Sequence, residues 1–232
     1  MELIWEGLKG AFKFLVHGDP EIREITLLSL RIAAWAIGIS SAIGLPLGIA
    51  LGVSTFRGRD FLLTLANTGM GLPPTVVGLW VAIVLWRTGP LGGLKLIYTP
   101  TAIIIAEVIL TVPIIVALVA AAASDKKAKL HDFFLSLGLN PLQYMWLLLR
   151  EIRSSVLTAI IAGFGRAISE VGAAMMVGGN IAGETRTLTT AIVLEVSKGE
   201  FDRALAISFV LLALSFSITA FITHLQYQQN LK

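Results

Sequence analysis

The sequence contains no cysteine, and only 14% of its 232 residues are charged. Without cysteine the chain has no disulfide bond, thiolate metal site or cysteine nucleophile, and the redox compartment stays open. A soluble domain usually carries about a quarter charged residues. The low charge content therefore indicates that lipid surrounds most of the chain, and the net charge of +3 gives no indication of nucleic-acid binding.

Long stretches without charge account for this composition. They run over residues 32–56, 61–86 and 204–223, and the mean hydropathy of the chain is +0.82. A helix needs about 20 apolar residues to cross the hydrocarbon core of a membrane. The sequence therefore predicts an all-α integral membrane protein with five spans, over residues 25–53, 61–86, 101–123, 154–179 and 204–223.

The N-terminal residues differ from the rest of the chain. Apolar residues recur at helical spacing between residues 3 and 15, and charged residues occupy the opposite face. This polarity favours a helix that lies in the membrane interface, and its charges are not compatible with a signal peptide. We therefore divide the chain into an N-terminal amphipathic segment, residues 1–20, and a transmembrane domain, residues 21–232.

Two features inside the predicted spans concern helix packing and continuity. Gly44, Gly48 and Gly52 recur every four residues in the first span, a spacing that lets helices approach closely. Pro73 and Pro74 interrupt the second span. The carbonyls that two prolines leave free are tolerated where the helix faces protein or a watery cavity. We therefore expect close packing at the glycines and a broken second span.

Sequence motifs for catalysis are missing. The chain has no G-x-x-x-x-G-K-[ST] loop to bind ATP, no H-E-x-x-H zinc motif and no G-x-S-x-G nucleophile elbow. Its three histidines are far apart in sequence. We therefore expect a chain that is not an enzyme, with no catalytic residue, no metal site and no cofactor of its own.

Glu107, Arg166 and Glu170 lie far from the ends of their predicted spans. Arg166 and Glu170 are four residues apart and share a helix face. Charged residues at membrane depth face the bundle interior or water, because an arginine at the centre of a span costs about 2.5–3.5 kcal/mol on insertion scales. The pair can be structural, can line a transport pathway, or can be interfacial without a role. For Glu107 a structural role is favoured.

Residues 180–190, NIAGETRTLTT, are rich in hydrogen-bond donors. Asn180, Arg186 and four threonine hydroxyls suit an oxyanion that must keep its hydrogen bonds while it loses water. The alternative is a solvated loop whose hydroxyls cap helices, and composition alone favours this alternative. Of the two arginines, we expect Arg186 to influence anion passage more directly than Arg166.

Two segments carry a family resemblance. The first reads GLPPTVVG at 71–78 and is followed by GPLG at 89–92; the second reads GFGRAISEVGAAMMVGGNIAGETRTLTTAI at 163–192. Both resemble the permeases of molybdate-type, binding-protein-dependent ABC importers. The form GETRTLTT is most similar to tungstate permeases, and the resemblance covers about residues 24–228.

A third segment resembles the coupling loop of the same importers more loosely. That loop has the pattern E-A-A, three residues, G, nine residues, then I-x-L-P. With Gly138 aligned to the glycine, an aspartate stands in place of glutamate and two phenylalanines in place of the alanines. Leu148 keeps the aliphatic character of the I position, while Arg150 and Glu151 depart from L and P. The resemblance implies a short amphipathic coupling helix over 131–142, with ATPase contacts at Asp132, Phe133, Phe134, Leu137, Gly138 and Leu139.

The resemblance implies a five-span MetI-like permease bundle in the inner (cytoplasmic) membrane, with an interfacial N-terminal helix and a cytoplasmic coupling helix. Residues 124–141 would face the cytoplasm and 180–203 the outside. The implied partners are a second copy of the chain, two ABC ATPase subunits that bind ATP and Mg, and a periplasmic or lipid-anchored oxyanion-binding protein. We expect tungstate import by alternating access along a pathway that includes Pro73, Pro74, Arg166, Ser169, Glu170, Asn180, Thr185, Arg186 and Thr187.

Other functions stay open. Molybdate import is the nearest alternative, and sulfate or phosphate import is a further one. A secondary transporter driven by an ion gradient belongs to a different class, with Glu107 and Glu170 as its candidate proton carriers. Such proteins usually have inverted repeats and midplane ion sites, and the sequence shows neither. A membrane-embedded enzyme is disfavoured by the missing catalytic motifs.

Overall fold

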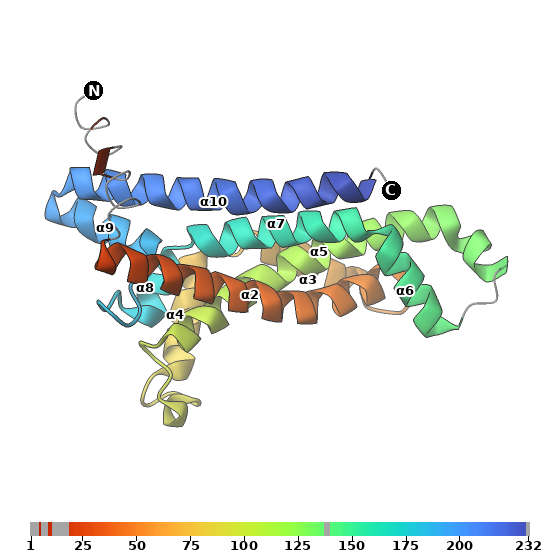
Figure 1. Cartoon of the computed structure of the whole chain (residues 1–232). Coiled ribbons are helices and arrows are strands. Elements are labelled where there is room, and N and C mark those ends of the chain that lie inside the picture. Colours follow the sequence, from red (N-terminus) through yellow and green to blue (C-terminus); the bar gives the residue numbers. More distant parts are fainter. Residues whose placement is uncertain (1–4, 6–8, 11–18, 137–139, 231–232) are drawn as a thin grey trace. The chain divides into compact units, whose positions relative to one another are not determined.

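The computed structural model describes residues 5, 9–10, 19–136 and 140–230, and every regular element in these residues is a helix (Figure 1). The all-α prediction is confirmed. The predicted amphipathic segment 1–20 lies almost entirely outside the described residues. The helices are α2 (Pro20–Val53), α3 (Arg59–Met70), α4 (Pro74–Leu85), η1 (Gly92–Leu94), α5 (Pro100–Ser136), α6 (Pro141–Glu151), α7 (Arg153–Ser169), α8 (Gly172–Gly178), α9 (Leu188–Lys198) and α10 (Phe201–Asn230).

Among the described residues, three helical stretches are long and apolar enough to cross a membrane by themselves: α2, residues 100–127 of α5 and residues 201–228 of α10. The pairs α3–α4 and α7–α8 meet the same criteria only when each pair is taken together across its short break. If each pair forms one span, the chain has five spans, which is the predicted number.

The first span begins earlier than predicted because Asp19 caps it. Its carboxylate oxygen Oδ1 accepts hydrogen bonds from the backbone N–H groups of Glu21, at 2.9 Å, and Ile22, at 3.4 Å. These are two of the donors that a helix start leaves without an intrahelical partner. Pro20 occupies the first helical position, where its missing N–H has no consequence.

The chain after the third span differs from the prediction. We expected a polar connection and then a short amphipathic piece over 131–142, but α5 continues without interruption to Ser136 and the separate helix α6 begins at Pro141. Alanine and lysine, which are frequent in this polar stretch, are good helix formers. The start of α6 is fixed by a capping box, in which Asn140 and Gln143 exchange side-chain to backbone hydrogen bonds of 2.8 and 3.0 Å.

The second and fourth predicted spans are both broken. The break in the second span was predicted, and there Pro73 is the N-cap and Pro74 the first residue of α4. The break in the fourth span was not predicted: α7 ends at Ser169, and Glu170 and Val171 stand between the two helices. Arg166 and Glu170 keep helical spacing up to this second break, and apolar residues resume directly after Gly172, so that periodicity alone could not reveal it.

The chain divides into two compact units, which we describe separately. Unit 1 contains α4, α8, α9 and one end each of α2, α5, α7 and α10; it comprises Met1–Ala36, Pro73–Glu107 and Gly165–Ala220. Unit 2 contains α3, α6 and the other ends of those four helices; it comprises Ile37–Leu72, Val108–Phe164 and Phe221–Lys232.

In unit 1, α4 packs closely against α8. A Cβ added at Gly78 would lie 2.7 Å from the Cα of Ala173, and one added at Gly172 would lie 2.8 Å from Cγ2 of Thr75. Only glycine fits at such distances. The helix starts that follow the two breaks are therefore in direct contact within this unit.

Unit 2 depends on a close crossing of α2 and α5, and the predicted glycines Gly44, Gly48 and Gly52 all lie in it. A Cβ added at Gly48 would lie 2.8 Å from the Cβ of Val119, and one added at Gly52 would lie 2.6 Å from the Cβ of Ala123. The predicted packing role of these glycines is confirmed.

Replacing Gly48 with alanine is expected to destabilise the protein by forcing α2 and α5 apart, since overpacking a tight contact costs about 1–3 kcal/mol. The matched control is Gly38→Ala in the same helix, where nothing lies within 4 Å of the added Cβ. Alanine favours the helix over glycine by about 1 kcal/mol, so that this control should be neutral or stabilising. Thermal unfolding in detergent compares the two, and a Gly48→Ala protein as stable as the control would contradict the assignment.

Candidate functional site

The four threonines predicted as anion donors lie in unit 1, and all are buried, with exposed fractions of 6% or less. Thr187 and Thr190 form the capping box that starts α9, since each hydroxyl accepts a hydrogen bond from the other residue's N–H, at 3.4 and 2.9 Å. The Thr185 hydroxyl donates to the Gly178 carbonyl at 2.6 Å and accepts from the Ile181 N–H at 2.9 Å. These hydroxyls cap helices and bind backbone, as the alternative interpretation of the segment expected, but they are buried and not solvated.

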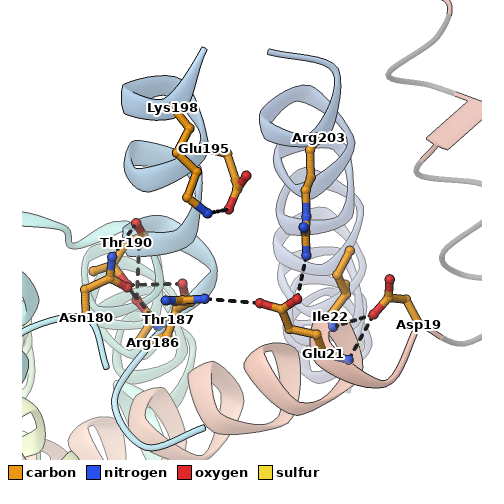
Figure 2. A network of polar contacts seen from close by, with 10 residues as sticks. All are labelled: Asp19, Glu21, Ile22, Asn180, Arg186, Thr187, Thr190, Glu195, Lys198 and Arg203. Atoms are coloured by element: carbon orange, nitrogen blue, oxygen red, sulfur yellow. Dashed lines mark hydrogen bonds and ion pairs between the residues drawn. The ribbon is translucent and has the colours of Figure 1, made fainter. Parts of the chain in front are cut away.

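The two other donors of this segment are also engaged (Figure 2). Nη1 of Arg186 lies 3.1 Å from Oε1 of Glu21, and the second oxygen of Glu21 binds Arg203. The Arg186 side chain is only 16% exposed. The side-chain amide of Asn180 donates to the carbonyl of Thr190 at 3.4 Å. One carboxylate thus connects the start of α2, the segment before α9 and the start of α10.

Glu170, at the break between α7 and α8, is held from three directions. Its Oε1 accepts a hydrogen bond from the N–H of Ala173 at 3.1 Å, which satisfies one donor at the start of α8. Its Oε2 lies 3.9 Å from Nε of Arg166, so that the predicted pairing is present. Its backbone carbonyl accepts from the Thr189 hydroxyl at 2.8 Å. These contacts fix the geometry of the break.

A cavity of about 10 Å³ adjoins this break within unit 1. A space of that size holds about one water molecule, and it is too small for a tetrahedral oxyanion. Its polar lining consists of Ser29, Glu107, Glu170, Thr187 and Thr189. Two carboxylates therefore face the same small space, and this arrangement does not attract an anion. Among the described residues, no group of three His, Asp or Glu side chains could hold a metal ion.

Ser169 and the two prolines, also predicted for the pathway, have local contacts. The Ser169 hydroxyl donates to the carbonyl of Gly165, one turn earlier, at 2.7 Å. Because Pro73 has no N–H, it leaves the carbonyl of Gly69 without its helical donor. That carbonyl accepts instead from the N–H of Leu72 at 3.2 Å. The pathway role of these residues stays a prediction.

The predicted ATPase-coupling residues fall in and after the last turns of α5. Asp132, Phe133 and Phe134 belong to this helix. The other three, Leu137, Gly138 and Leu139, lie outside the described residues.

Helix α6, which follows, is anchored to unit 2 by one face. Leu148 and Ile152 are fully buried in the core that contains Val119 of α5. The opposite face exposes apolar side chains, including Trp146, whose ring carries the guanidinium of Arg150 at 5.8 Å. An exposed apolar face on a helix anchored in this way can bind another protein.

Two lysines after the third span bind the surrounding helices of unit 2. Nζ of Lys126 lies 2.8 Å from Oε1 of Glu151 at the end of α6, and Lys127 donates to the carbonyl of Val53 at 2.6 Å. Burial raises the pKa of the Tyr144 phenol on α6 above its ordinary value, so that it stays neutral. These contacts join α5 to the ends of α2 and α6 in the region predicted to face the cytoplasm.

Sequence reasoning missed two residues that hold the site in place, Glu21 and Ser29. It singled out Thr189 as an anion donor and not as the donor to the backbone carbonyl of Glu170. The buried Ser29 hydroxyl accepts from the N–H of Leu188 at 2.9 Å and donates to the carbonyl of Ile25 at 2.8 Å. A serine on the apolar side of α2 is a weak signal in a sequence. The partners of all three residues are remote along the chain, and no local pattern identifies them.

The hydrogen bond between Thr189 and Glu170 gives a stability prediction. Thr189→Val keeps the shape of the side chain but leaves the buried carbonyl of Glu170 without this donor, which costs about 1–3 kcal/mol. We expect a lower temperature of thermal unfolding in detergent. The control is Thr64→Val on α3, where an exposed hydroxyl bonds only the carbonyl of Asp60 in its own helix. Equal unfolding temperatures for the two variants would show that the Thr189 bond does not hold the break.

Comparisons with known proteins agree with this architecture. Residues 44–228 match the family model described as "Binding-protein-dependent transport system inner membrane component". The tungstate uptake system permease protein TupB of Peptoclostridium acidaminophilum is 41% identical over 97% of this chain and 99% of its own length. The corresponding TupB of Campylobacter jejuni is 34% identical over 97% and 93%.

A probable anion ABC transporter permease protein of Haloferax volcanii is 40% identical over 84% of this chain and 87% of its own length. Among solved structures, a chain of the MetNI methionine ABC transporter in inward facing conformations has a TM-score of 0.65 at 16% identity, and the match covers 90% of this chain and 93% of that one. At this identity the likeness shows the fold, which confirms the predicted MetI-like bundle. Together with the helical spans, the family match identifies this multi-pass membrane protein as a member of the binding-protein-dependent transport system inner membrane components.

Proposed function

We propose that the chain is the permease subunit of an ATP-driven ABC importer that carries tungstate into the cytoplasm by alternating access. The observation that carries this proposal is the 41% identity, over 97% of the chain, to a tungstate uptake permease. Sulfate permeases match at only 26–28% identity, so that sulfate import is a weaker alternative. Molybdate import is the closest one.

The assembly that we propose contains two copies of this chain, two ATPase subunits and an oxyanion-binding protein on the outer face. The ATPase subunits bind ATP and Mg, and this chain carries no cofactor. The end of α5, residues 137–139 and the exposed face of α6 would dock on the ATPase. The firm anchoring of α6 through Leu148 and Ile152 supports this part of the proposal, because a lever must be rigid to transmit motion.

Within the membrane, the two broken helices are the elements that we expect to reorient. Broken helices are common at the transport sites of membrane transporters. Arg166 and Glu170 hold one break, and Pro73 and Pro74 form the other. Arg186 would act on passage through its bond to Glu21. Because tungstate and molybdate have the same charge and shape, we assign the selection between them to the external binding protein.

ATP hydrolysis tests the proposed function. The chain is reconstituted in liposomes with its ATPase and binding protein, and hydrolysis is titrated with tungstate, molybdate and sulfate. We expect stimulation by tungstate at concentrations well below those needed for molybdate. Equal responses to tungstate and molybdate would keep the importer and reject the tungstate assignment. If a stable complex responded to none of the three oxyanions, the proposed cargo would be rejected. Transport by the chain alone along a proton gradient would favour a secondary transporter.

The coupling assignment has its own test. Gly138→Leu places a bulky side chain at the position aligned with the glycine of the coupling loop. We expect normal insertion into the membrane but ATP hydrolysis that is no longer linked to uptake. Uptake and hydrolysis are measured in the same liposomes, at equal abundance of the variant and the original protein. Normal uptake per ATP hydrolysed would count against a coupling role for residues 132–139.

A further inference from the structure

The arginine expected to meet the anion most directly is not available to it. Arg186 has its guanidinium on Glu21 at 3.1 Å, and its side chain is only 16% exposed. Glu21 also binds Arg203, so that the carboxylate is shared by two cations and the three side chains form one structural connection (Figure 2). An incoming anion would have to compete with Glu21 for Arg186.

Two other arginines, Arg23 and Arg31, line a separate cavity of about 500 Å³ beside α2 in unit 1. They are eight residues apart, which corresponds to about 12 Å along a helix, and Leu27 lies between them in the same lining. Both side chains are exposed. The cavity has room for a tetrahedral oxyanion together with part of its hydration shell, unlike the space beside Glu107.

The charges in this cavity are not neutralised. Within the described part of the chain, neither Arg23 nor Arg31 forms an ion pair, whereas Arg59, Arg186 and Arg203 each do. Glu24 is the acidic residue of the lining, so that two cations face one carboxylate. Unpaired guanidinium groups offer planar pairs of N–H donors, the geometry that binds oxyanions through two parallel hydrogen bonds.

The backbone at Gly183 forms the facing wall of the cavity. This residue has a φ of 75°, a conformation that side-chain-bearing residues rarely adopt. A Cβ added there would point toward Glu24, with Oε1 at 3.9 Å. Glycine therefore keeps this wall free of a side chain.

The position of Arg31 along α2 indicates what this cavity can bind. Arg31 directly precedes the charge-free residues 32–56, which are long enough to cross the hydrocarbon core. It therefore lies where an ion that enters the membrane must begin to exchange water for other donors. A cation without a carboxylate partner at this depth is stabilised by an anion.

We propose that Arg23 and Arg31 form a capture site for a divalent tetrahedral oxyanion at the mouth of the transport pathway. This inference rests on the proposed import of an oxyanion. It transfers direct contact with the anion from Arg186 to these two residues. Glu24 opposes binding and keeps the site weak.

The test uses the complete transporter in liposomes and measures initial tungstate uptake against concentration. Arg31→Gln and Arg23→Gln are each expected to raise the half-saturating concentration about tenfold, which is the lower limit for the loss of one charged hydrogen-bonded contact. Arg31→Lys should have a smaller effect, since it keeps the charge and loses the paired donors. Glu24→Gln should have the opposite effect and lower the half-saturating concentration, an outcome that a purely structural role would not produce.

Arg57→Gln is the matched control, because Arg57 is an exposed arginine just beyond the other end of α2 and should leave uptake unchanged. Size-exclusion chromatography confirms equal assembly of every variant. Unchanged half-saturation in both Arg23→Gln and Arg31→Gln, while the original protein still imports tungstate, would overturn the capture site alone. If these two variants no longer assembled into the complete transporter, the capture site would also be overturned. This face of α2 would then be assigned to the contact between the two copies of this chain. Absence of oxyanion uptake by the original protein would instead reject the proposed function.

Discussion

A broken helix inside a membrane must satisfy its own backbone groups, because lipid offers no hydrogen bonds. This constraint explains why the polar residues of unit 1 lie where they do. The break after α7 is closed by Glu170, whose side chain binds the N–H of Ala173 and whose carbonyl receives the Thr189 hydroxyl. Thr185 does the same for the carbonyl of Gly178 at the end of α8. The threonine-rich segment is thus the means by which a helix can stop at membrane depth.

The same constraint separates two uses of arginine. Where an arginine has a carboxylate beside it, as Arg186 has Glu21, the pair fixes one helix end to another. Where no carboxylate forms an ion pair with it among the described residues, as at Arg31, the guanidinium keeps its donors for a ligand. Exposure distinguishes the two cases better than position in the sequence does, since Arg186 lies in the segment richest in donors and is nevertheless the less accessible of the two.

Much of the fold follows from the sequence, because span length and glycine spacing are local signals. Long, predominantly apolar runs predict the five spans, and the glycine spacing correctly predicts the close packing of α2 at Gly48. The break at Glu170 could not be predicted, since Arg166 and Glu170 have the spacing of a continuous helix and the hydrogen-bond partner of Glu170, Thr189, is remote in the chain. The role of the threonines could not be decided for a similar reason: a hydroxyl that caps a helix and one that binds an anion look identical in a sequence. The extension of α5 to Ser136 shows that a polar, lysine-rich stretch need not be a loop.

A transport pathway needs contacts that an ion can leave as well as enter. The buried hydroxyls around Thr187 could bind an oxyanion only if their present hydrogen bonds were broken, and those bonds close the break after α7. Once freed, such a buried set of donors would also hold the oxyanion too tightly for release. Two exposed guanidinium groups, opposed by Glu24, meet the requirement better, because solvent and salt weaken their attraction. A weak first contact also leaves selection to a protein that binds the ion before it reaches the membrane. On this argument the buried threonines maintain the shape of the pathway, and the exposed arginines of α2 make the contact with its cargo.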